Sequence, residues 1–125
     1  ALYHRLGARV HRDYFANALA LVHRHPAVTA DLPSAGRVTL VHQPRRRRYV
    51  VHLLYAPALA RGRTVVLEDM PALRDVAVAL RVPRRLQTAT LEPGAKALRL
   101  ARDGDGGVAV RVPSVACHQA VAFGY

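Results

Sequence analysis

The sequence contains little of several residue types, and each shortage excludes a class of structure. Cys117 is the only cysteine, which excludes an internal disulfide framework and a zinc site built from several cysteines. No apolar run approaches the roughly 20 residues of a membrane-spanning helix, so a membrane is not an expected partner. Tryptophan is absent and aromatic residues make up 6% of the chain, which leaves few rings for stacking on sugars.

The beginning of the chain also lacks familiar signals. It starts Ala1-Leu2-Tyr3-His4, with no initiator methionine and no basic segment followed by an apolar one. We therefore expect a segment cut from a longer polypeptide, with a cytoplasmic location.

The residues that are present suffice for one folded domain. The 125 residues are 51% hydrophobic, too apolar for a disordered chain and enough to bury a core. The charge is one-sided, with 19 basic residues against 8 acidic ones and a net charge of +11. Positive charge attracts polyanions. The positive charge has a second explanation, however: the chain would be basic simply because an acidic neighbouring domain is missing.

Helical periodicity is confined to residues 7–24, where apolar residues recur at steps of three and four. His25-Pro26 ends this pattern, because the residue before a proline is disfavoured in the helical region. The segment from residue 31 to 36 is typical of a connector. The apolar stripe of the helix consists of Val10, Tyr14, Ala18, Leu21 and Val22, widened by Phe15 and Leu19.

This stripe is too wide for one narrow contact. We expect the helix to bury it on the rest of the domain and to leave Phe15 and Leu19 for a second surface. A large exposed apolar patch is rare on a monomer. The sequence therefore predicts that copies of the chain associate through this helix. The alternative is a helix complete in itself, with Phe15 and Leu19 filling the same groove as the rest of the stripe.

From residue 37 onward the apolar pattern has a period of two, and proline, glycine and aspartate separate the runs. Short strands at this spacing predict an all-β antiparallel sandwich of about eight strands with one N-terminal helix packed outside it. A parallel α/β sheet is excluded, because no segment of helical length lies between the strands. We interpret 1–30 as the helical tail of a preceding domain plus a connector, and 31–125 as the sandwich. The expected strands are 37–43, 48–55, 64–68, 75–82, 86–91, 96–101, 107–112 and 119–124.

The first hairpin can be placed by residue. If 44–47 is the turn, Gln43 faces Arg48, and each pair of facing residues then has numbers that sum to 91. One face carries more large aliphatic residues than the other, and we expect it to be the core face. It consists of Val38, Leu40, His42, Tyr49, Val51 and Leu53, whereas Thr39, Val41, Val50 and His52 lie on the other face.

Acidic residues are too few and too dispersed for an evident catalytic pair. Glu68-Asp69 is the one adjacent pair, but neighbours in a strand point to opposite faces, whereas glycoside hydrolysis needs two carboxyl groups facing each other. Asp103 and Asp105 lie in Asp-Gly-Asp-Gly-Gly, which is typical of a turn and lacks the length of a calcium loop.

Histidine and cysteine give no clear site either. Seven histidines invite a metal site, but His23 and His25, or His4 and His11, lack the four-residue spacing of helical zinc ligands. Cys117-His118 could be a nucleophile and its base, yet adjacent strand residues diverge and no oxyanion loop is evident. We therefore expect no catalytic residue, no metal ligand and no cofactor.

Arg45-Arg46-Arg47-Arg48 is the densest charge run. It could contact phosphate or another polyanion. It could instead be a solvated turn, or a turn that docks on an acidic partner domain. Tyr49 alone follows directly, so the interleaved aromatic residues of single-strand nucleic-acid sites are missing. Nucleic acid is thus the less favoured partner.

Several stretches together resemble the C-terminal part of large bacterial glycoside hydrolases of the β-galactosidase-like group. In that group a catalytic (β/α)₈ barrel is followed by a glutamine-amidotransferase-like domain and then by a small all-β domain. The barrel holds the catalytic carboxylates, so the resemblance transfers no active-site residue to this chain. It rests on residues 31–40, on 48–57 (RYVVHLLYAP), on 67–76 (LEDMPALRDV) and on 112–118 (VPSVACH).

The resemblance implies a non-catalytic C-terminal accessory domain of a glycoside hydrolase. Such a domain would pack against other domains of the parent chain or support oligomerisation. Two alternatives stay open: a carbohydrate-binding module, which the shortage of aromatic rings disfavours, and a polyanion-binding domain. The candidate interaction residues are Arg45, Arg46, Arg47, Arg48, Phe15 and Leu19.

Overall fold

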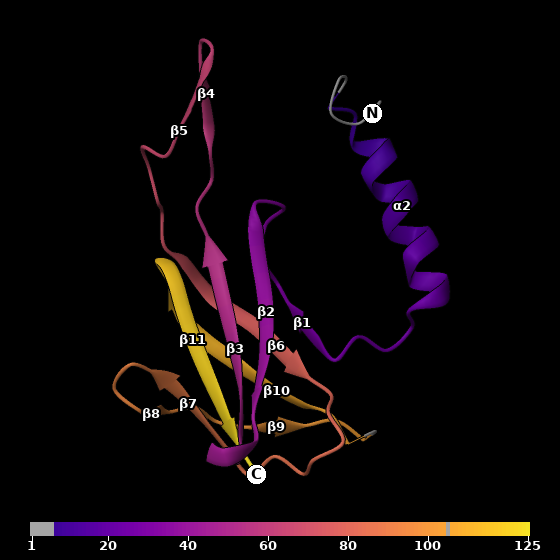
Figure 1. Ribbon diagram of the computed structural model, residues 1–125, viewed down its shortest axis with the longest axis vertical. Helices are drawn as coiled ribbons and strands as arrows, with labels where there is room; N and C mark the ends of the chain where they lie inside the picture. The colour runs from indigo at the N-terminus through magenta and orange to yellow at the C-terminus, as the bar shows by residue number, and fades with distance from the viewer. Residues whose placement is uncertain (1–6, 105) are drawn as a thin grey trace.

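The computed structural model describes residues 7–104 and 106–125, which form one α-helix, one 3₁₀ turn and eleven strands (Figure 1). Two antiparallel sheets face each other, and a third, two-stranded sheet projects beyond them. The predicted all-β antiparallel sandwich with one N-terminal helix is confirmed. The elements are α2 (Arg9–Val22), β1 (Val28–Ala30), β2 (Gly36–Gln43), η1 (Pro44–Arg46), β3 (Arg48–Tyr55), β4 (Leu59–Arg61), β5 (Thr64–Val66), β6 (Leu73–Leu80), β7 (Thr88–Glu92), β8 (Lys96–Ala97), β9 (Ala101–Arg102), β10 (Val108–Val115) and β11 (Cys117–Gly124).

The two main sheets are linked directly at one corner. The four-stranded sheet has the order β1-β6-β10-β9, and the five-stranded sheet has the order β2-β3-β11-β7-β8. Only Ala116 separates β10 from β11, so the chain passes there from one sheet into the other. Cys117 follows with a φ of 64°, a left-handed conformation that turns the backbone at this corner.

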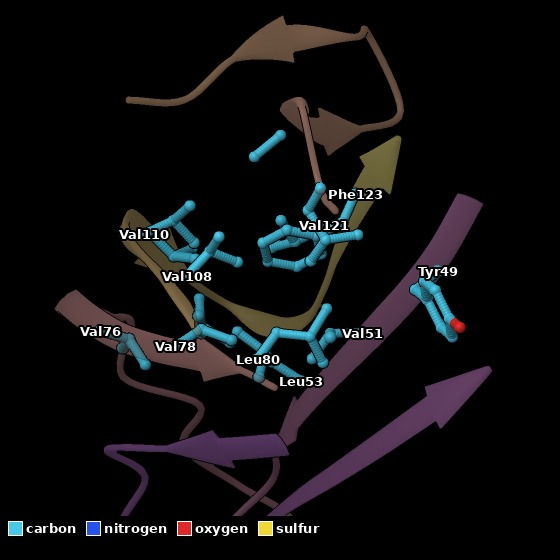
Figure 2. Close-up of a cluster of buried hydrophobic side chains, with 14 residues drawn as sticks. Tyr49, Val51, Leu53, Val76, Val78, Leu80, Val108, Val110, Val121 and Phe123 are labelled. Atoms are coloured by element: carbon cyan, nitrogen blue, oxygen red, sulfur yellow. The ribbon is translucent and has the colours of Figure 1, made fainter. Parts of the chain in front are cut away.

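Alternating valine and leucine residues build the core between these sheets, as Figure 2 shows. Strands β3, β6, β10 and β11 bury alternate side chains there, which is the period expected of half-buried strands. In the described part of the chain no polar or charged residue is buried. The fully buried large side chains are Leu53, Val51, Phe123, Val121, Leu80, Val78, Val112 and Val115.

The β2–β3 hairpin has the predicted register. Gln43 pairs with Arg48 and Gly36 with Tyr55, so the predicted sum of 91 holds along the ladder. The β3 half of the predicted core face is buried, whereas on β2 Leu40 is half-buried and Val38 and His42 are exposed. The reason is that β2 is the edge strand of its sheet and has a neighbour on one side only.

Two strands that the sequence did not predict, β1 and β4, are three residues long, too short to show an alternating pattern. The predicted single strand 96–101 is wrong: the chain forms β8 in the five-stranded sheet and β9 in the four-stranded sheet, with residues 98–100 between them. β1 lies before residue 31, and it pairs with β6 as the edge of the four-stranded sheet. β4 pairs with β5 to form a hairpin outside the sandwich, so the expected strand 64–68 is part of this separate hairpin.

The expectation that helix α2 buries its stripe on the sandwich is wrong. No residue of the helix is buried, and Phe15 and Leu19 are 68% and 61% exposed. The two sheets already cover each other's apolar faces. The outer face of the four-stranded sheet carries small or charged side chains such as Ala77, Ala109 and Arg111, which offer the helix no large apolar side chain to pack against.

Candidate functional site

A hairpin arm projects from one end of the sandwich (Figure 1). It comprises β4, β5 and the segments that join them to β3 and β6, that is, residues 56–72, which we call the arm. Its turn places Gly62 at the first central position with a φ of 61°, as in type II′ hairpin turns. The arm adds little to the core, because its large apolar side chains face solvent: Leu59, Val65, Leu67 and Met70.

An ion pair stabilises the arm from within. Arg61 donates from Nε and Nη2 to the Glu68 carboxylate, and the Nε–Oε2 distance is 3.1 Å. The hydrogen bond to Glu68 raises the pKa of Arg61 above its ordinary value. Glu68 therefore has a structural partner, which is at odds with a role as a free catalytic acid.

Helix α2 and the arm together form what we call the apolar end of the domain. On the helix, Val10, Tyr14, Leu21 and Val22 are as exposed as the two residues singled out from the sequence. Asp13 pairs with Arg12 and Arg9 on the helix surface, and the hydrogen bond from Arg12, followed by that from Arg9, lowers the pKa of Asp13. The apolar end thus presents large apolar side chains with few polar contacts among them.

The β2–β3 turn and the β6–β7 loop lie at the opposite end of the sandwich, near the label C in Figure 1. The turn contributes three exposed arginines and the loop a fourth. We call Arg45, Arg46, Arg47 and Arg84 the arginine end. Arg48, the last residue of the sequence run, belongs elsewhere: it donates from Nε to Gln43 Oε1 at 2.7 Å and lies 3.6 Å from the Glu92 carboxylate.

The arginine end surrounds an aromatic cluster. His42 stacks on Tyr49 with a centroid distance of 4.2 Å, and its Nε2 lies 3.0 Å from the hydroxyl oxygen of Tyr125. The guanidinium carbons of Arg47 and Arg84 lie 6.0 Å and 5.8 Å from the centre of the Tyr125 ring. These distances are typical of cation–π contacts. The predicted register of the β2–β3 hairpin already places His42 opposite Tyr49. Tyr125 and Arg84 come from distant segments, and the sequence did not indicate that they join this pair.

The outer face of the five-stranded sheet contains a shallow groove of about 310 Å³. His52 and His118 line it, with Nδ1 of the first 3.1 Å from Nε2 of the second. Arg48 and Glu92 line the same groove, and Ala120 forms part of its floor. The polar side chains of this groove thus contact one another in two pairs, His52 with His118 and Arg48 with Glu92.

Metal and acid–base chemistry find little support in the described residues. No group of three or more histidine, cysteine, aspartate or glutamate side chains converges there. Asp103 accepts a hydrogen bond from the backbone N–H of Gly107, as expected of a turn residue. Two further residues named in the sequence analysis, Asp105 and His4, lie outside the described residues. No helix within residues 7–104 and 106–125 has the length and hydropathy to cross a membrane.

Fold and surfaces together define a β-sandwich domain with exposed apolar side chains at one end and exposed arginines at the other. No family model matches the chain, and no curated protein matches it. Among solved structures, it is similar to alpha-L-fucosidase isoenzyme 2 from Paenibacillus thiaminolyticus, with a TM-score of 0.91 and 32% sequence identity. The similarity covers 98% of this chain and 19% of the fucosidase, so the chain spans about a fifth of that protein.

The similarity takes in helix α2 and the arm as well as both sheets, because it covers nearly the whole chain. A C-terminal β domain of a glycoside hydrolase fits this comparison. Nothing in it points to the β-galactosidase-like group that the sequence suggested, since the similar protein is named as a fucosidase.

Proposed function

We propose that the chain is a non-catalytic accessory domain of a glycoside hydrolase, docked through its apolar end against the rest of a longer polypeptide. The observation that carries this proposal is the unburied apolar helix. Val22 and Leu21 are 82% and 72% exposed, and no residue of α2 is buried. Apolar surface of this extent is unfavourable in water and is a mark of an interaction site.

The occupant of the apolar end is another part of the same polypeptide. The fucosidase shares the helix, the arm and the sandwich with this chain, and four-fifths of its length lies outside the similarity. An apolar surface that accompanies the fold in a much longer protein is best covered by the remainder of that protein. The arm and the helix both stand away from the sheets (Figure 1). Each would then contact the remainder of the longer polypeptide.

The absence of a catalytic role is part of the proposal and is supported by how the carboxylates are used. Glu68 pairs with Arg61, Glu92 with Arg48, and Asp75 with Arg111. A glycosidase needs two carboxyl groups about 5–10 Å apart across the scissile bond. For the parent chain we propose hydrolysis of α-L-fucosides, from the name of the similar protein, in place of the β-galactosides that the sequence resemblance suggested.

The test compares the 125-residue chain with a longer polypeptide that contains it. We expect the chain alone to hydrolyse neither nitrophenyl α-L-fucoside nor nitrophenyl β-galactoside, and the longer polypeptide to hydrolyse the fucoside. In the longer polypeptide, the double substitution Phe15→Glu and Leu19→Glu should lower the unfolding temperature and the activity. Ala16→Glu and Ala20→Glu add the same charge about 100° further around the helix, outside the apolar stripe, and are the matched control.

Two results would overturn this proposal. One is hydrolysis by the chain alone that is lost with Glu68→Gln or Glu92→Gln. The other is a longer polypeptide whose stability and activity are indifferent to the change at Phe15 and Leu19.

A further inference from the structure

The guanidinium groups of the arginine end lack carboxylate partners in the part of the chain that the structure describes. The ion pairs found there belong to other arginines, those at positions 9, 12, 48, 61, 81 and 111. Arg45, Arg46, Arg47 and Arg84 are exposed and make none of these pairs. Like charges held this close repel one another, and an anion seated among them would remove that repulsion.

Backbone hydrogen bonds hold the position of Arg47, and Arg84 lies against the same tyrosine ring. The N–H of Arg47 donates to the carbonyl of Pro44 at 3.0 Å, and its own carbonyl accepts the N–H of Tyr125 at 3.0 Å. The hydrogen bond between His42 and the Tyr125 hydroxyl fixes the ring on which both guanidinium groups lie. Two cations from separate loops are thus brought to one ring before any ligand binds, which lowers the entropy cost of binding.

The position of the arginine end leaves it accessible. It lies at the far end of the long axis from the arm (Figure 1). This step rests on the proposed function: if the apolar end docks on the rest of a longer polypeptide, the arginine end points away from that interface. A cationic surface turned outward in this way is available to a ligand from solution.

We propose that the arginine end binds an acidic polysaccharide through the carboxylate or sulfate groups of its sugars. The planar guanidinium fork matches such groups with two parallel hydrogen bonds. A single-stranded nucleic acid fits less well, because it requires several exposed rings for successive bases. Tyr49 is buried and His42 stacks on it, and Tyr125 is the ring over which these guanidinium groups lie in the described part of the chain. Similarity to a glycoside hydrolase also makes a glycan the chemically consistent ligand.

The test is isothermal titration calorimetry of the 125-residue chain with four probes. Polygalacturonate supplies carboxylates, dextran sulfate supplies sulfates, neutral dextran supplies neither, and a DNA duplex supplies phosphates. We expect binding to one or both acidic polysaccharides, none to neutral dextran, and an affinity that falls steeply from low to physiological salt. The two acidic probes show which anion is preferred.

Two pairs of substitutions make the test specific to the site. Arg47→Asn with Arg84→Gln should weaken binding by about tenfold or more, since each charge-assisted hydrogen bond contributes substantially. Asparagine is chosen because Arg47 has a φ of 49°, which asparagine tolerates. Arg37→Gln with Arg63→Gln removes the same charge elsewhere and should leave the affinity within about twofold of wild type.

The proposal is overturned if neither acidic polysaccharide binds, if both pairs of substitutions weaken binding equally, or if the DNA duplex binds more tightly with the same residue dependence. Binding is measured on the chain alone and needs no docking partner. Its failure would therefore leave the proposed docking of the apolar end untouched, and the reverse also holds.

Discussion

Arg61 of β4 donates to the carboxylate of Glu68, seven residues further along, and so ties the outgoing strand of the arm to the segment that returns to the sandwich. Both side chains are exposed, at 62% and 44%. Exposed ion pairs add little to global stability. The arm, however, has no apolar core of its own, and a two-stranded hairpin is only marginally stable in water. In the arm the ion pair therefore contributes to local order.

Glu68→Gln should loosen the arm without unfolding the sandwich. The substitution keeps the size of the side chain and removes its charge, so the bidentate contact with Arg61 weakens. We expect faster amide exchange at β4 and β5 and an unchanged midpoint of global unfolding, measured by hydrogen–deuterium exchange and denaturant titration. Asp69→Asn is the control, since no contact to that side chain is found among the described residues. Unaltered exchange in the arm would show that the ion pair does not order it.

Leu53→Ala should lower the free energy of unfolding much more than Leu54→Ala, although the two residues are neighbours in β3. Leu53 is completely buried between the sheets, whereas Leu54 is 41% exposed on the opposite face. Removing a buried leucine leaves a cavity and costs about 2–5 kcal/mol. The exposed one should cost less than about 1 kcal/mol. Equilibrium denaturation of both variants checks this difference, and equal costs would contradict the assignment of the core face.

The sequence was informative wherever structure is local. The β2–β3 register followed from a four-residue turn and alternating side chains, and the structure has the same pairs from Gly36–Tyr55 to Gln43–Arg48. Strand order was beyond reach, because β3 takes β11 as its other neighbour and the pattern of neither strand specifies the partner. The contact between His52 and His118 depends on that pairing and could not be foreseen.

For the candidate surfaces, too, the sequence showed the local residue pattern but not the contacts that depend on the fold. The arginine run was visible in the sequence, but its last member, Arg48, turns to Glu92 on the sheet face, and Arg84 arrives from a distant loop. The apolar stripe of the helix was also visible. Its exposure was not, because periodicity shows that a face is apolar and not what covers it.

Helix α2 should lose stability in acid through Asp13. Hydrogen bonds from Arg12 and then Arg9 lower the pKa of this carboxyl below its ordinary 3.8. A lowered pKa in the folded state means that the stabilisation is present above pH 3.8 and is lost as the pH falls through the lowered value. We expect Asp13→Asn to reduce the helical content of residues 9–22 at neutral pH and to match wild type at the lowest pH.

Residue-resolved NMR chemical shifts follow the helix separately from the sheets and provide the measurement. Asp31→Asn serves as the control, because no hydrogen bond to that exposed carboxyl is found in the described part of the chain. The two arginine contacts are on the surface, so added salt should shrink the difference. A helix whose content in wild type and variant falls in parallel across the whole pH range would contradict a role for the Asp13 carboxylate.

The chain on its own should self-associate through α2, because the partner that we propose for the apolar end is then missing. Phe15 and Leu19 lie one turn apart on the helix and are both mostly exposed, so two helices can bury them against each other. Light scattering at rising concentration should show dimers or larger species for wild type and a monomer for the Phe15→Glu, Leu19→Glu variant. Ala16→Glu with Ala20→Glu should associate like wild type.

The denaturation midpoint extrapolated to low concentration should be equal for all three, because α2 does not pack on the sandwich. A wild-type chain that stays monomeric at high concentration would contradict association through this helix.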